Sequence, residues 1–154
     1  METQNQSRRE AELYQEIYKN VTMGAQSLTD LIGRSQGDLK TELGVELAGY
    51  EKLAEEAREA LFDMGVTPRE QGVVAKLSAK AGMAMSTMMD TTTSHLAQMT
   101  IEGSTMGTTD LLRKINEYEC EAGEKGEGAE KVLSLARRTV DFEESCIEKL
   151  KSYL

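Results

Sequence analysis

The fold is decided by residues 37–64, GDLKTELGVELAGYEKLAEEAREALFDM. Apolar residues recur in this stretch at every third or fourth position, which is the spacing of one helix face. Gly65 follows at once and Pro68 comes soon after, so the stretch predicts one long helix that ends near residue 64. Glu46 lies within the apolar face, close to its middle. The face consists of Leu39, Leu43, Leu47, Tyr50, Leu53, Ala54, Ala57 and Leu61.

Three further stretches share this periodicity and predict helices over about 6–33, 94–120 and 129–153. A very short turn precedes helix 37–64, and a glycine-rich turn separates the last two helices, so each pair predicts an antiparallel hairpin. Residues 66–93 have a periodicity of their own, which predicts a partly helical crossover between the hairpins. We therefore expect a single all-α domain over residues 1–154, a ferritin-like four-helix bundle with one long crossover between the second and third helices.

Composition and charge argue against several classes of function. The chain has 154 residues, a formal net charge of -9 and no lysine or arginine cluster, which disfavours nucleic acid or an anionic membrane as the main partner. It shows no signal-peptide pattern and no apolar run of about 18 residues, so we expect a cytoplasmic protein without a transmembrane segment. Cys120 and Cys146 are expected to be reduced. Phosphate-loop, nucleophile-elbow and Cys-x-x-Cys motifs are also missing, which disfavours an enzyme of those classes.

Two glutamates, Glu46 and Glu143, fall within apolar helix faces and are expected to point into the core. Short hairpin turns bring Gly24 to the height of Glu46, and Gly103 and Gly107 to the height of Glu143. Two carboxylates and three glycines are thus predicted to share one layer, in which the missing side chains leave space. This layer is the candidate site.

The positions of the two glutamates resemble those of metal ligands in the ferritin-like superfamily. In that superfamily two helices each supply a Glu, and two each supply a Glu-x-x-His pair, around a di-iron or di-manganese centre. Glu46 and Glu143 match the glutamates of the two pairs, whereas Gly49 and Cys146 occupy the histidine positions. The resemblance implies Glu46 and Glu143 as metal ligands, with iron or manganese as the metal.

Parts of the chain also look like an uncharacterised bacterial group of ferritin-like type with no assigned activity. The similarity covers residues 94–99, SHLAQM, residues 103–107, GSTMG, and the tail 141–154. It implies the same fold and carries no activity, substrate or cofactor with it.

Three interpretations of the inward glutamates stay open. Each carboxyl can be hydrogen-bonded by a neighbour such as Tyr50, Tyr14, Tyr18 or Thr139, can bind a metal or small ligand, or can share a proton with the other carboxyl. If protonation neutralises them, replacement of both by Gln is expected to be tolerated or stabilising. If a metal does, the same change is expected to remove the metal and lower stability.

A second candidate metal site is the flank of the helix predicted over 94–120. His95, Met99, Glu102 and Met106 follow i, i+4, i+7 and i+11 spacing, which suits a soft metal such as Cu(I) and equally suits ordinary packing by methionine. His95, the single histidine, is expected at the helix end without a catalytic role.

The crossover concentrates four methionines between Met83 and Met89. This segment is expected to be at least partly buried, either against the bundle or against a second copy of the chain, which favours a homo-oligomer. Two functions follow from these features. The first is a non-catalytic bundle acting as a structural, stress-related or interaction protein, and the alternative is a degenerate metal-binding protein that uses Glu46 and Glu143.

Overall fold

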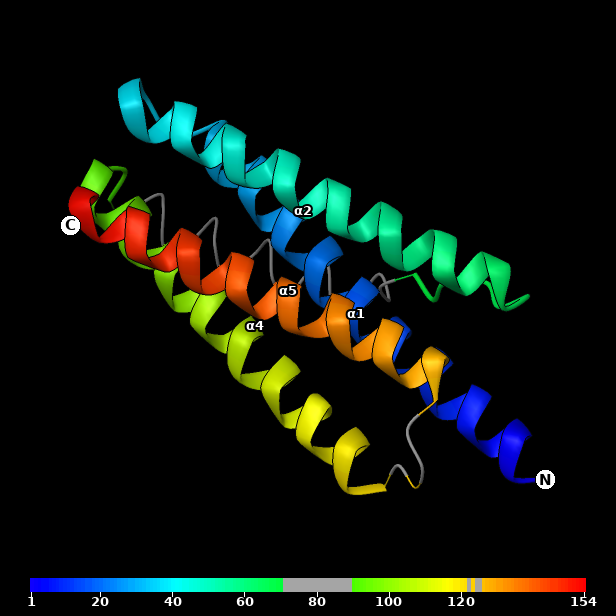
Figure 1. Ribbon diagram of the computed structural model, residues 1–154. Coiled ribbons are helices and arrows are strands. Elements are labelled where there is room, and N and C mark those ends of the chain that lie inside the picture. The colour runs from blue at the N-terminus through cyan, green and yellow to red at the C-terminus, as the bar shows by residue number, and fades with distance from the viewer. Residues whose placement is uncertain (71–89, 122, 124–125) are drawn as a thin grey trace.

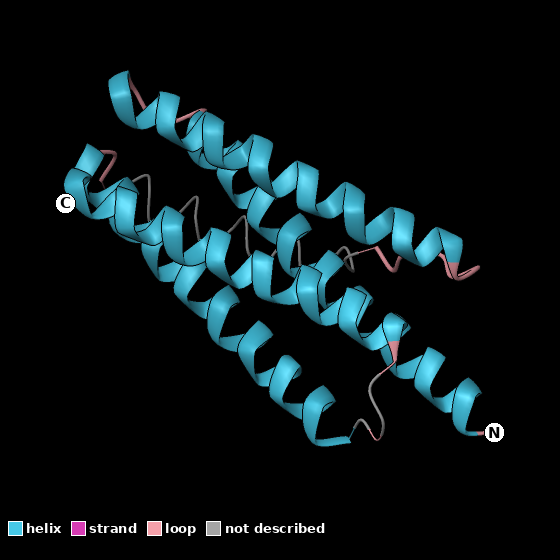
Figure 2. Ribbon diagram, viewed as in Figure 1, coloured by secondary structure: helices cyan, strands magenta, loops and turns pink. Residues whose placement is uncertain are grey.

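A computed structural model describes residues 1–70, 90–121, 123 and 126–154, and these residues form long helices (Figures 1 and 2). The all-α prediction is confirmed, because within these ranges the chain contains helices and no strand. The predicted crossover lies partly outside these ranges, and the Met83–Met89 segment lies wholly outside them. The elements are α1 (Glu2–Ile32), α2 (Gly37–Asp63), α4 (Thr93–Glu121), α5 (Glu127–Leu150) and a short 3-10 helix, η1 (Lys151–Tyr153).

The helices form two antiparallel hairpins, α1 with α2 and α4 with α5 (Figure 1). Helices α2 and α4 run in the same direction, so α2 ends at the opposite end of the bundle from the start of α4 (Figure 1). Helix α1 packs against α2, α4 and α5. No described helix is long and apolar enough to span a membrane, as predicted.

Local chemistry fixes the helix ends. After α2, Gly65 adopts the left-handed φ of +71° and the amide of Val66 donates to the carbonyl of Leu61, an arrangement that glycine accommodates readily. Helix α1 begins at Glu2, four residues before the predicted start. Its first turn is polar and exposed, so this turn has no apolar face from which periodicity could predict it. Thr92 Oγ1 accepts a hydrogen bond of 3.3 Å from the amide of His95, so the threonine-rich run caps α4 as predicted.

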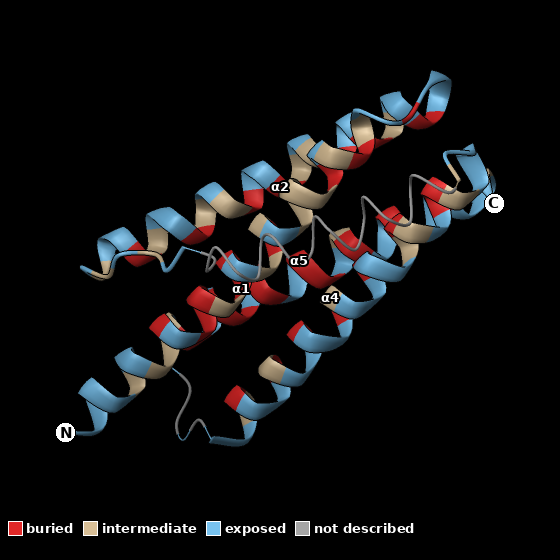
Figure 3. Cartoon of the chain, turned by 180° about the vertical axis from the view of Figure 1, so that it is seen from behind, coloured by how far each residue is buried: buried red, intermediate tan, exposed pale blue. Residues whose placement is uncertain are grey.

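The apolar faces predicted from periodicity meet in one core, with buried residues on the sides that the helices turn toward one another (Figure 3). Both cysteines are free thiols, as expected; Cys120 is exposed and Cys146 is buried. The largest fully buried apolar side chains are Ile17, Val21, Leu39, Leu43, Leu61, Leu96, Leu111, Val132 and Leu150.

Contacts along the α2–α5 interface fix the register of these two antiparallel helices. Residues that come later in α2 contact residues that come earlier in α5. As a consequence, Glu46 lies opposite Cys146, and Tyr50 lies opposite Phe142 and Glu143. The contacts are an ion pair of 3.8 Å between Glu42 and Lys149, the packing of the Phe142 ring against Gly49, and an ion pair of 2.8 Å between Glu56 and Arg138.

The chain after α2 turns back onto α1. The Gln15 side chain donates to the carbonyl of Thr67 at 3.1 Å and accepts from the amide of Arg69 at 2.9 Å. One turn further along α1, the Tyr18 hydroxyl donates to Glu70 at 3.4 Å. These contacts direct residues 67–70 along α1 toward its C-terminal end. They also give the Tyr18 hydroxyl a partner other than the inward glutamates.

Gly49→Ala is expected to destabilise the folded state by about 1–3 kcal/mol, because a Cβ at this position would overlap the Phe142 ring. That ring packs edge-on against Tyr50 with centroids 5.1 Å apart, which limits its freedom to move. The matched control is Gly44→Ala on the same helix, where a Cβ meets nothing within 4 Å. The control should gain up to about 1 kcal/mol from helix propensity. Urea unfolding followed by circular dichroism measures both changes, and effects of equal sign would contradict the packing described.

Candidate functional site

The buried carboxyl of Glu143 is the centre of a polar layer in the core. Glu143 is 2% exposed. Its Oε1 accepts a hydrogen bond of 3.4 Å from the Tyr50 hydroxyl of α2, and its Oε2 accepts one of 3.1 Å from the Thr108 hydroxyl of α4. The Ser104 side chain, one turn before Thr108, also forms a hydrogen bond with the Tyr50 hydroxyl. One carboxyl of α5 thus connects α2 and α4.

Glycines allow the helices to approach this layer closely. A Cβ on Gly24 of α1 would lie 2.6 Å from Cε1 of the Tyr50 ring, and a Cβ on Gly107 would lie 3.3 Å from Glu143 Oε1. Asn20 of α1 donates a hydrogen bond of 2.8 Å to the Gly107 carbonyl. All four long helices of the described chain therefore meet here, and two of the three predicted glycines touch the polar side chains.

Burial sets the protonation of this layer. Loss of hydration raises the pKa of Glu143 to about 7, against the opposing effect of the hydrogen bonds from Thr108 and Tyr50. The pKa of Tyr50 is also raised, first by loss of hydration and then by the neighbouring Glu143 charge. Tyr50 therefore remains a hydrogen-bond donor across the neutral range, while Glu143 gains or loses its proton within that range.

Glu46 has a different environment, although it is equally buried, with 1% exposure. Neither of its carboxyl oxygens has a hydrogen-bond partner among the described residues. Loss of hydration, and next the charge of Glu42, raise its pKa to about 8, while Lys149 acts in the opposite direction. Loss of hydration, followed by the charge of Glu46, raises the pKa of the Cys146 thiol to about 12. At neutral pH the Glu46 carboxyl is mostly protonated and the thiol is not a thiolate.

The two glutamates occupy neighbouring levels of the bundle. Because Glu46 lies opposite Cys146, it is offset from Glu143 by three residues of α5, a rise of about 4.5 Å. The pKa values of Tyr50 and Cys146 respond to the charges of both carboxylates. The inward orientation predicted for both side chains is confirmed by their burial.

A groove of about 640 Å³ between α1 and α4 reaches this layer. Glu143, Tyr50 and Ser104 are among its lining residues and are buried, so they lie at its floor. The groove is also lined by the three predicted glycines, and a Cβ on Gly103 would meet nothing within 4 Å. Apolar side chains form its walls, namely Met23, Leu28, Leu31, Met99, Met106 and Leu111, and the charged residues that line it are Glu16, Lys19, Asp110, Arg113 and Lys114.

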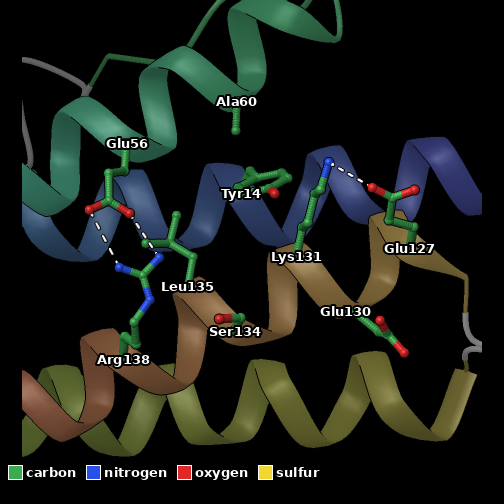
Figure 4. Close-up of a pocket in the computed structure, with 9 residues that line it drawn as sticks. All are labelled: Tyr14, Glu56, Ala60, Glu127, Glu130, Lys131, Ser134, Leu135 and Arg138. Carbon is green, nitrogen blue, oxygen red and sulfur yellow. Dashed lines mark hydrogen bonds and ion pairs between the residues drawn. The ribbon is translucent and has the colours of Figure 1, made fainter.

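A second hollow of about 450 Å³ lies among α1, α2 and α5 and is lined by charged side chains (Figure 4). Arg138 pairs with Glu56 at 2.8 Å, and Lys131 pairs with Glu127 at 3.1 Å (Figure 4). Four of the charged side chains that line this hollow therefore form ion pairs with one another, and Glu130 is the further charged residue that lines it.

The predicted strip on α4 is divided between different surroundings. Met99 and Met106 line the groove, whereas Glu102 is exposed and accepts a hydrogen bond of 2.9 Å from Gln98. His95 is half-buried in the first turn of the helix. Throughout the described ranges, no three His, Cys, Asp or Glu side chains form a group that could hold a metal ion. The donor set of a two-metal carboxylate centre is therefore not assembled by these residues.

Sequence reasoning missed Asn20, Ser104 and Thr108 as parts of the site. A signal for two of them was present, because Thr100, Ser104 and Thr108 recur at every fourth position of α4 and all three are buried. A polar stripe at helical spacing beside an inward carboxylate indicates hydrogen-bond donors to it.

Comparisons with protein-family models, with curated proteins and with solved structures found no match to this chain. The class that its structure defines is an all-α bundle with a buried polar layer at the floor of a groove.

Glu46→Gln is expected to stabilise the protein at alkaline pH. The folded-state pKa of Glu46 is raised from 4.5 to about 8, so the folded state holds a proton that the unfolded state releases between these values. The stabilising contribution of this group is complete below the unfolded pKa and is lost as pH rises through the folded pKa. The free energy of unfolding should therefore fall by on the order of 1.4 kcal/mol per pH unit from this group alone.

Glu143 adds a slope of the same sign up to its pKa of about 7, so the interval from there to about 8 isolates Glu46. Urea unfolding of the parent and of Glu46→Gln across the neutral and mildly alkaline range measures the difference. Stability curves that stay parallel over that interval would contradict the protonated state assigned to Glu46.

Proposed function

We propose that this protein is a non-catalytic, ferritin-like four-helix bundle that binds a small amphipathic molecule in the groove between α1 and α4. The observation that carries the proposal is the Glu143 carboxyl at the floor of a groove whose walls are apolar. A volume of about 640 Å³ falls within the range of about 300–1,000 Å³ typical of small-molecule sites. A few polar groups at one end of an apolar site orient a ligand, which is the arrangement found here.

The protonation of the layer favours binding over catalysis. Tyr50 and Cys146 have raised pKa values, so neither is an activated nucleophile at neutral pH. Glu143 has a pKa near neutrality, but its neighbours Thr108 and Tyr50 are ordinary hydroxyl donors. An interaction protein, rather than an enzyme, is the function consistent with these groups.

The ferritin-like assignment is supported by the helix directions. Two antiparallel hairpins with α2 and α4 running in the same direction require one long connection, as ferritin-like bundles have (Figure 1). The inward glutamates on α2 and α5 are also consistent with this assignment.

Metal binding through Glu46 and Glu143 is the second candidate function. The observation in its favour is that both oxygens of Glu46 are buried without a hydrogen-bond partner in the described part of the chain. Growth with iron, manganese and copper, followed by a count of metal per purified chain, tests it. Glu46→Gln should remove any metal held there, whereas a metal-free parent would exclude this candidate.

Blocking the groove tests the first proposal. Gly103→Leu is expected to weaken binding of a neutral apolar dye such as Nile red by roughly tenfold or more, about 1.4 kcal/mol, because the new side chain occupies the groove. Gly44→Leu is the matched control, since a Cβ on Gly44 also meets nothing within 4 Å but this residue does not line the groove.

The urea concentration at the midpoint of unfolding should be at least as high for both variants as for the parent, because leucine favours helix more than glycine does. Fluorescence titration gives the dissociation constants. Equal binding by the parent and by Gly103→Leu would place the dye elsewhere and contradict the proposal.

A further inference from the structure

We infer, on the basis of the ligand-binding groove proposed above, that its ligand carries a protonated amine, which forms an ion pair with Glu143 at the groove floor. The groove walls then hold the apolar body of the same molecule. This inference assigns a chemical class of ligand to the site.

The Glu143 carboxylate can accept further hydrogen bonds beyond the two that it accepts from the described chain. An ionised carboxylate has about four acceptor positions on its two oxygens. The described chain fills two of them, with the hydroxyls of Tyr50 at 3.4 Å and Thr108 at 3.1 Å. Both donors are uncharged, so neither neutralises the carboxylate.

A further acceptor with no partner belongs to Asn20, which lines the same groove as Glu143. Asn20 Oδ1 is buried and receives no hydrogen bond within the described ranges, while Asn20 Nδ2 donates to the Gly107 carbonyl. A Cβ placed on Gly107 would lie 3.2 Å from Asn20 Nδ2 and 3.3 Å from Glu143 Oε1, so the Asn20 side chain and the carboxylate both lie close to Gly107. A side chain at residue 107 would crowd both groups.

The floor therefore presents acceptors that an ammonium group satisfies. An alkylammonium has three N–H donors, one positive charge and no acceptor. It matches two carboxylate oxygens and one amide oxygen, and it supplies the charge that the neutral hydroxyls do not. Attraction between the opposite charges is strong at a site that is largely screened from water.

Other head groups fit the floor less well. A carboxylate or phosphate would face the Glu143 charge, and like charges at a buried site repel. An alcohol has a single donor and leaves the carboxylate charge unbalanced. The other charged residues of the groove lie nearer to solvent than the floor does. Arg113 pairs with Asp110 at 3.2 Å and Lys114 pairs with Glu117 at 3.1 Å, and all four of these side chains are exposed or partly exposed. Glu16 is half-buried and Lys19 is exposed. Selectivity is therefore set by the floor.

Three ligands with the same tail and different heads test the inference on the unmodified protein. Calorimetric titration with decylamine, decan-1-ol and decanoate is done at about pH 8, above the pKa of about 7 of Glu143. Decylamine is expected to bind at least tenfold tighter than the alcohol, with decanoate weakest. Since this comparison needs no variant, it stands even where a substitution fails to fold.

Glu143→Gln then assigns the preference to one residue. The amide keeps one acceptor oxygen, for either Tyr50 or Thr108, and it has no charge, so the amine and the alcohol should bind this variant equally. Glu46→Gln is the matched control, because it also replaces a buried glutamate by its amide, at a position that does not line the groove. The control should keep the full preference for the amine.

The outcomes separate this inference from the function on which it rests. Binding of the amine and the alcohol with equal affinity, or tightest binding of decanoate, overturns the assignment of the head group and leaves the groove as a binding site. Retention of the amine preference by a folded Glu143→Gln overturns the assignment to Glu143. Binding of none of the three ligands overturns the groove function itself.

Discussion

The burial of the Glu143 carboxyl is the constraint on which the rest of the bundle depends. A carboxyl taken out of water without compensation costs several kcal/mol, a large part of the stability of a domain. Compensation requires the Tyr50 hydroxyl from α2 and the Thr108 hydroxyl from α4, both at hydrogen-bond distance. It also requires small residues, because a side chain at Gly24 would displace Tyr50. A shift of any one helix along its axis would break part of this layer.

The two buried glutamates are stabilised in different ways, and only Glu143 lines the groove. Glu143 keeps hydrogen-bonded oxygens beside the groove, whereas Glu46 lies between Glu42 and Cys146 without a hydrogen-bond partner in the described chain. Raised pKa values mean that both carboxyls release a proton near neutrality. Glu46 is therefore best understood as a protonated core residue, and Glu143 as a carboxyl whose charge depends on what occupies the groove.

Periodicity predicted the helices and the inward glutamates because both are local properties of the sequence. The groove could not be predicted in this way, since it depends on how α1 and α4 lie against each other, although they are far apart along the chain. Gly103 illustrates the limit. Its spacing placed it at the height of Glu143, but only the packing shows that it opens toward the groove while Gly107 contacts Glu143. Asn20 gave no signal, because a half-buried asparagine in a helix is usually unremarkable.

The three glycines have different effects on the bundle. Gly24 and Gly107 allow Tyr50 and Glu143 to approach the helices closely, whereas the position of Gly103 is open, since a Cβ there would meet nothing within 4 Å. A bundle selected for stability alone would place alanine or leucine at residue 103, because both favour helix more than glycine does. A molecule that binds only the folded chain and fills this space adds stability in proportion to its binding free energy. The proposed ligand therefore gives one common explanation for the open position at Gly103 and for the incompletely paired carboxyl of Glu143.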